Sequence, residues 1–91
     1  MGWSCSKVAN DTLEDLTKIC IEQTESQNLF NHKGKQYIFE TSRREYSDGS
    51  ITGSILEVNG NYAKKVENFR IDGTTGEITR GSKLKQLIKH R

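Results

Sequence analysis

Charged and aromatic side chains are unusually dense in the segment Arg43-Arg44-Glu45-Tyr46, shortly before Asp48-Gly49. A planar guanidinium beside an aromatic ring suits the recognition of phosphate groups and nucleobases. The segment lies on the first strand of a predicted hairpin, so alternation places Arg44 and Tyr46 on one face of the sheet and Arg43 on the other. The pair of Arg44 and Tyr46 is therefore the strongest candidate for a binding surface.

A neighbouring strand can extend this pair. Arg70 and Lys64, both on the next predicted strand, are the residues that could join it. The alternative is an ordinary solvated strand, in which Arg43 or Arg44 pairs with Glu45 or Glu57 across the ladder. Both interpretations stay open. The candidate ligand- or partner-binding residues are Arg43, Arg44, Tyr46 and Arg70.

Other kinds of reactive site are not indicated. The two cysteines and two histidines lack the close paired spacing of zinc sites, and no Gly-x-Ser-x-Gly nucleophile elbow occurs. The glycines fit turns and strands rather than a phosphate-binding loop. Cys20 falls on the apolar stripe of a predicted helix, where a buried thiol is unreactive. We therefore expect no catalytic residue, no metal and no cofactor, and we expect that the protein is not an enzyme.

The composition limits the classes of partner. A chain of 91 residues is one domain with a thin core, and its hydrophobic content of 32% is low. The net charge of +2 is too small to favour strong nucleic-acid binding, although a weak interaction through the basic terminal segment is conceivable. No apolar run has the length of a membrane span or forms a signal peptide. We expect a cytoplasmic protein with reduced cysteines that does not enter a membrane.

One long helix is predicted near the start of the chain. Apolar residues recur at helical spacing over 8–26, at Ala9, Leu13, Leu16 and Cys20, with Ile21 about 120° away from them. An arm over 1–7 precedes this helix. Gly2 and Ser6 in the arm fit a short N-myristoylation pattern, but few basic residues follow, so we favour an arm that packs on the protein.

The rest of the chain reads as strands joined by glycine-containing turns. A short strand over 28–31 precedes a long hairpin over 35–59 that turns at Asp48-Gly49, and Asn59-Gly60 is a strong hairpin signal. Strands over 62–72 and 77–80 follow, and Ser82 is expected to cap a basic helix over 82–91. These elements predict one α+β domain over 1–91, with the N-terminal helix packed on an antiparallel meander of about five strands over 28–80.

The register of the long hairpin decides which residues share a face. A two-residue turn groups Tyr37 and Phe39 with Leu56 and Val58, whereas a three-residue turn with a bulge groups them with Ile51 and Ile55. Either register leaves apolar residues on the second face, which one helix cannot cover. A second copy of the chain is the simplest cover, so we expect a homodimer or a larger oligomer. Gly53, inside a strand, indicates a bulge or a close approach to the backbone.

The order of these motifs resembles that of small proteins encoded by bacteriophages and prophages. The resemblance lies in the helix, Ser26-Gln27-Asn28, the hairpin with Asp48-Gly49 and Thr52-Gly53, and Phe69-Arg70-Ile71-Asp72-Gly73. It transfers no functional residues, but it implies a small accessory protein that acts by binding in the host cytoplasm. Inhibition of a host defence protein by contact is the first hypothesis. Sequestration of a small nucleotide signal and weak nucleic-acid binding are the alternatives.

Overall fold

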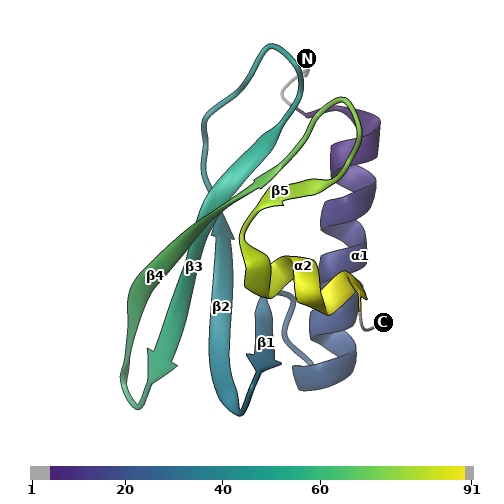
Figure 1. Cartoon of the computed structure of the whole chain (residues 1–91). Coiled ribbons are helices and arrows are strands. Elements are labelled where there is room, and N and C mark those ends of the chain that lie inside the picture. Colours follow the sequence, from purple (N-terminus) through teal and green to yellow (C-terminus); the bar gives the residue numbers. More distant parts are fainter. Residues whose placement is uncertain (1–4, 90–91) are drawn as a thin grey trace.

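The fold is an α+β domain, as predicted. The computed structural model describes residues 5–89, so most of the predicted arm and the last two residues lie outside the described part (Figure 1). The elements in chain order are α1 (Lys7–Thr24), β1 (Leu29–His32), β2 (Lys35–Thr41), β3 (Ile51–Asn59), β4 (Tyr62–Ile71), β5 (Ile78–Arg80) and α2 (Ser82–Lys89).

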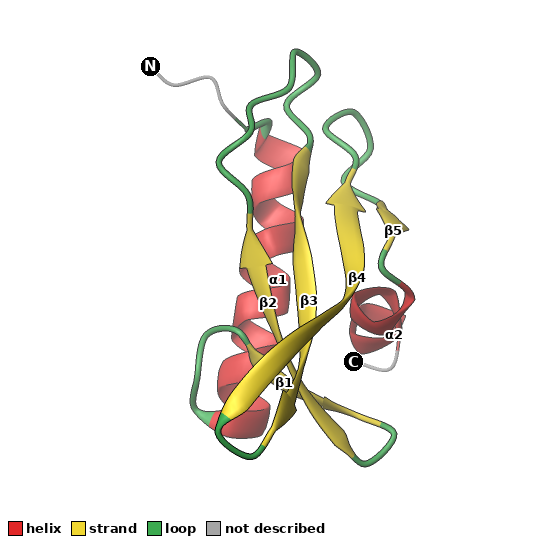
Figure 2. Ribbon diagram, turned by 90° about the vertical axis from the view of Figure 1, so that its left-hand side faces the viewer, coloured by secondary structure: helices red, strands yellow, loops and turns green. Residues whose placement is uncertain are grey.

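The five strands form one antiparallel sheet whose spatial order, β1-β2-β3-β4-β5, is also the chain order. Both helices lie on the same side of this sheet, to its right in Figure 1. We call this side the inner face. The opposite side, turned towards the viewer in Figure 2 with α1 behind it, is the outer face, and neither helix covers it. The predicted meander is confirmed.

The long helix α1 is close to its predicted position. The Ser6 hydroxyl accepts a hydrogen bond from the Ala9 amide and caps the start of the helix, while Glu25 ends it in the left-handed conformation. The predicted stripe packs on the sheet: Ala9, Leu16 and Cys20 are fully buried, and Leu13 packs against the same core. Ile21 is 43% exposed, as expected from its angle to the stripe.

The core lies between the helices and the inner face. Phe39 pairs with Ile55 in the ladder, and Tyr37, Phe39, Ile51 and Ile55 are all buried on that face. The ring of Phe39 meets that of Phe69 edge to face, with centroids 5.8 Å apart, which is a favourable aromatic geometry. This grouping is the one expected for the three-residue turn with a bulge.

The turn itself was predicted wrongly. Residues 42–50 connect β2 to β3 as a loop, and Thr41 of β2 pairs with Gly53 of β3. Asp48 and Gly49 therefore do not close a tight hairpin, although Gly49 does adopt the positive φ expected of it. The segment with Arg43, Arg44 and Tyr46 lies in this loop rather than on a strand. Strand alternation consequently does not determine where these side chains point.

The terminal helix α2 completes the inner layer. Ser82 is its first residue rather than its cap, because the Lys85 amide donates to the Gly81 carbonyl, and the Ser82 hydroxyl donates to Glu67 instead. Leu84 and Leu87 are buried against the core. Within residues 5–89, neither helix is long and apolar enough to span a membrane.

Candidate functional site

A basic groove of about 500 Å³ lies on the outer face of the sheet, below the 42–50 loop. Three of the four predicted binding residues line it, namely Arg44, Tyr46 and Arg70, whereas Arg43 does not. The remaining lining residues come from the loop and from β3, β4 and β5. They are Ser42, Thr52, Gly53, Ser54, Lys65, Asn68, Phe69 and Arg80.

Hydrogen bonds at both ends of the loop hold Arg44 and Tyr46 against the sheet. The hydroxyls of Ser42 and Thr52 are 2.8 Å apart, and the Ser42 amide donates to the Thr52 carbonyl. Thr52 Oγ1 also donates to the phenolic oxygen of Tyr46 over 3.4 Å. At the far end, the Ser6 amide donates to the carbonyl of Gly49, which ties the loop to the start of α1. The loop is therefore anchored to two elements.

Arg70 joins the strand β4 to the loop. Its Cζ lies 5.2 Å from the centroid of the Tyr46 ring, a cation–π geometry. Its Nη2 donates to Asp48 Oδ2 over 3.2 Å and to Ser50 Oγ over 3.0 Å. The pKa of Asp48 is lowered by hydrogen bonds from Ser50 and further by the charge of Arg70. Ser50 is buried and also accepts from the Gly73 amide, so the Arg70 guanidinium has a fixed position.

Two further cations, which the sequence did not single out, also line the groove. Arg80 of β5 is the direct cross-strand partner of Arg70, so both guanidiniums belong to the outer face. Lys65 takes the place that was predicted for Lys64. The register of β3 and β4 shifts between Ile55 and Leu56, and this bulge turns Lys65 towards the groove while Lys64 pairs with Glu57 on the other face.

The groove is positively charged, and most of this charge has no acidic partner within residues 5–89. Arg44, Lys65, Arg70 and Arg80 line it, and none of its described lining residues is acidic. Of these four, only Arg70 forms an ion pair within residues 5–89, to Asp48 at the rim. Glu57, one of the carboxylates considered as a partner for Arg43 or Arg44, lies 3.9 Å from Lys35 instead. A hydrogen bond from Thr52, then one from Arg44 and the nearby positive charges, lower the pKa of Tyr46.

An apolar strip occupies the other end of the outer face. Leu29 pairs with Ile38, which pairs with Leu56, and Val58 follows on the same face of β3. All four side chains are half-buried. Ile38, Leu56 and Val58 are apolar residues that the three-residue turn left on the second face, whereas the two-residue turn had grouped Leu56 and Val58 with the core residues. The outer face thus combines a basic groove with a separate apolar strip.

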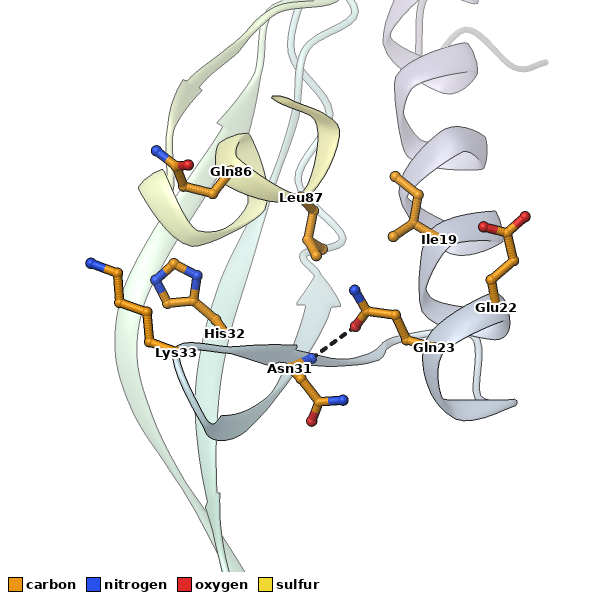
Figure 3. Close-up of a pocket in the computed structure, with 8 residues that line it drawn as sticks. All are labelled: Ile19, Glu22, Gln23, Asn31, His32, Lys33, Gln86 and Leu87. Carbon is orange, nitrogen blue, oxygen red and sulfur yellow. Dashed lines mark hydrogen bonds between the residues drawn. The ribbon is translucent and has the colours of Figure 1, made fainter. Parts of the chain in front are cut away.

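A second hollow lies on the helical side of the molecule, with a volume of about 520 Å³ (Figure 3). Ile19 and Gln23 of α1, His32 at the end of β1 and Leu87 of α2 surround it, and Gln23 accepts from the Asn31 amide. Partial burial and the charges of Lys33 and Lys83 lower the pKa of His32. Its walls mix apolar, amide and charged groups, so no single ligand chemistry is favoured there.

The donor set of the basic groove suits the binding of an anion. Guanidinium groups hold phosphate or carboxylate oxygens by paired charge-assisted hydrogen bonds, and the hydroxyls of Ser42, Thr52 and Ser54 add neutral polar contacts. No group of three or more His, Cys, Asp or Glu side chains that could hold a metal occurs within residues 5–89. Comparisons with protein-family models, curated proteins and solved structures find no match to this chain.

Proposed function

We propose that this chain is a non-enzymatic binding protein that inhibits a component of bacterial defence against phages, acting in the host cytoplasm. The observation that carries the proposal is the outer face, where a basic groove and an apolar strip lie on the only side of the sheet that neither helix covers. The phage setting is supported by the order of motifs, from Ser26-Gln27-Asn28 to Phe69-Arg70-Ile71-Asp72-Gly73.

A surface of this kind suits a protein partner with an acidic patch beside an apolar one. Complementary charge steers the encounter and fixes the register, while apolar contact and well-packed anchors supply most of the affinity. Arginine and tyrosine are the residue types that most often act as such anchors, and Arg44, Tyr46 and Arg70 lie together here. A typical interface of this class buries about 800 Å² on each partner.

A phage-challenge experiment tests the proposal. The chain is expressed in bacteria that each carry one defence system, and the plating efficiency of a phage restricted by that system is measured. We expect wild-type protein to restore plating in at least one strain, Arg43→Ala to act like wild type, and the double variant Arg44→Ala/Arg80→Ala to fail. No rescue in any strain, or equal rescue by the double variant, contradicts the proposal.

A further inference from the structure

Arg70 and Arg80 stand directly opposite each other on neighbouring strands and on the same face of the sheet. Like charges in this position destabilise a sheet. Asp48 at the rim neutralises only Arg70, and within residues 5–89 Arg80 has no ion-pair partner. An anion between the two guanidiniums removes this repulsion, so the arrangement favours a ligand with negative charge at that point.

Arg44 of the 42–50 loop supplies a third guanidinium to the groove. Arg80 belongs to β5, Arg70 to β4, and Thr52 pairs with Arg70 in the ladder, so these residues form a row across the sheet. The loop adds Arg44 and Tyr46 at the end of the row, because the Thr52 hydroxyl contacts the phenol of Tyr46. One cross-strand row therefore presents three guanidiniums and an aromatic ring to the same groove.

The limited extent of the positive charge favours a small ligand over a nucleic-acid polymer. The groove holds about 500 Å³, within the range of small-molecule sites. Beyond Lys65, the outer face continues as the apolar strip of Ile38, Leu56 and Val58. A nucleic-acid strand needs cations along its path to neutralise successive phosphates, and the strip provides none. The charge of the groove is thus matched to one or a few phosphates.

We infer that the basic groove is a nucleotide-binding site in which Arg44, Arg70 and Arg80 hold the phosphates and Tyr46 offers an aromatic surface to the base. The inference rests on the proposed use of the outer face, and it adds that the defence component is one that depends on a nucleotide. The phosphates of that nucleotide then supply the negative charge that the groove contacts, while the apolar strip contacts the component itself, and no covalent step is involved.

Calorimetric titration of the full chain with ADP, with inorganic phosphate and with a short single-stranded DNA tests the inference. We expect saturable binding of ADP, weaker binding of phosphate, and weaker still of the DNA. Arg44→Ala and Arg80→Ala should each reduce the ADP affinity by about tenfold or more, because each removes charge-assisted hydrogen bonds to a phosphate. Both side chains belong to exposed residues, so neither variant should melt below wild type. Without ligand, Arg80→Ala should melt slightly above it, because this variant removes the repulsion with Arg70.

Arg43→Ala is the matched control, because Arg43 is the neighbour of Arg44 but does not line the groove. Its ADP affinity should equal that of wild type. The inference is overturned by an absence of saturable ADP binding, by equal effects of Arg43→Ala and Arg44→Ala, or by DNA that binds more tightly than ADP with a steep salt dependence. Rescue of phage plating without ADP binding contradicts only this inference, whereas ADP binding without rescue contradicts only the proposed function.

Discussion

Arg70 lies over one face of the Tyr46 ring, with its Cζ 5.2 Å from the ring centroid, although one residue lies on β4 and the other in the 42–50 loop. The same guanidinium donates to Asp48 and Ser50. Three contacts thus join the loop to the sheet through one side chain. This arrangement places an aromatic ring and a cation side by side in the groove before any ligand is bound.

The titration of Tyr46 reports on this arrangement. A hydrogen bond from Thr52, another from Arg44 and the charges of Arg44 and Arg70 lower its pKa. We expect Arg44→Ala to raise the pKa of Tyr46 and Arg43→Ala to leave it unchanged, as measured by NMR of carbon-labelled tyrosine. An unchanged pKa in Arg44→Ala means that Arg44 does not face the phenol.

Asp48 should make the stability of the protein depend on pH in the acid range. Its pKa is lowered in the fold, mainly by hydrogen bonds from Ser50 and then by Arg70. A carboxylate of this kind stabilises the fold fully above its unfolded pKa of about 4, and this contribution is lost as the pH falls through the lower folded value. Urea unfolding should therefore show wild type to be more stable than Asp48→Asn at neutral pH, with the difference shrinking in acid. A difference that is constant with pH contradicts the role assigned to the carboxylate.

Cys20 should be an unreactive structural residue. Its side chain is fully buried on α1, and burial raises the pKa of the thiol to about 11. Thiol labelling of the native protein should be fast at the exposed Cys5 and slow at Cys20. Cys20→Ser should destabilise the protein by about 1–2 kcal/mol, because it buries a hydroxyl among apolar groups, and Cys5→Ser is the control. Fast labelling at both cysteines shows that the helix face is assigned wrongly.

Much of the fold was predictable because its signals are local. The helical spacing of Ala9, Leu16 and Cys20 marked α1, and Asn59-Gly60 marked the β3–β4 hairpin. The loop over 42–50 was not predictable in this way. Its shape depends on hydrogen bonds with distant segments. The Ser6 amide donates to the Gly49 carbonyl, and the Gly73 amide donates to the Ser50 hydroxyl. A local turn signal at Asp48-Gly49 cannot report such contacts.

The candidate site was predicted in part. Arg44, Tyr46 and Arg70 do meet in one groove, although Arg44 and Tyr46 reach it from a loop rather than by strand alternation. Arg43 was included in the prediction but does not line the groove. Arg80 and Lys65 were missed because their position depends on register: Arg80 faces Arg70 only through the β4–β5 pairing, and the bulge near Leu56 selects Lys65. Neither pairing leaves a signal in the local sequence.

Gly53 should be intolerant of a side chain. A Cβ built there lies 2.5 Å from the ring of Phe69 and overlaps the Glu40 carbonyl, so the glycine is the close approach that the sequence indicated. We expect Gly53→Ala to destabilise the fold by about 1–3 kcal/mol, the usual cost of overpacking a core. The matched control is Ser54→Ala, the next residue on the opposite face. Equal melting temperatures for Gly53→Ala and wild type contradict the packing described here.

In the absence of the defence partner, the chain should self-associate through the apolar strip. Ile38 sits between Leu29 and Leu56 in the ladder, and a second copy is the proposed cover for these side chains. Light scattering on a size-exclusion peak should give the mass of a dimer or larger at high micromolar concentration. Ile38→Glu should yield a folded monomer, because it places a charge in the contact. A monomeric mass for wild type rules out this use of the strip.

Amide chemical-shift mapping of the nitrogen-labelled protein during an ADP titration tests the central claim most directly. If the basic groove binds ADP, the largest shifts should occur at residues that line it, namely Arg44, Tyr46, Thr52, Arg70 and Arg80. In Arg80→Ala these shifts should require about tenfold more ADP or higher. The amides of Asn31, His32 and Lys33, at the second hollow, should stay unchanged. Shifts confined to that hollow, or the same shifts at the same ADP concentrations in Arg80→Ala, contradict the account.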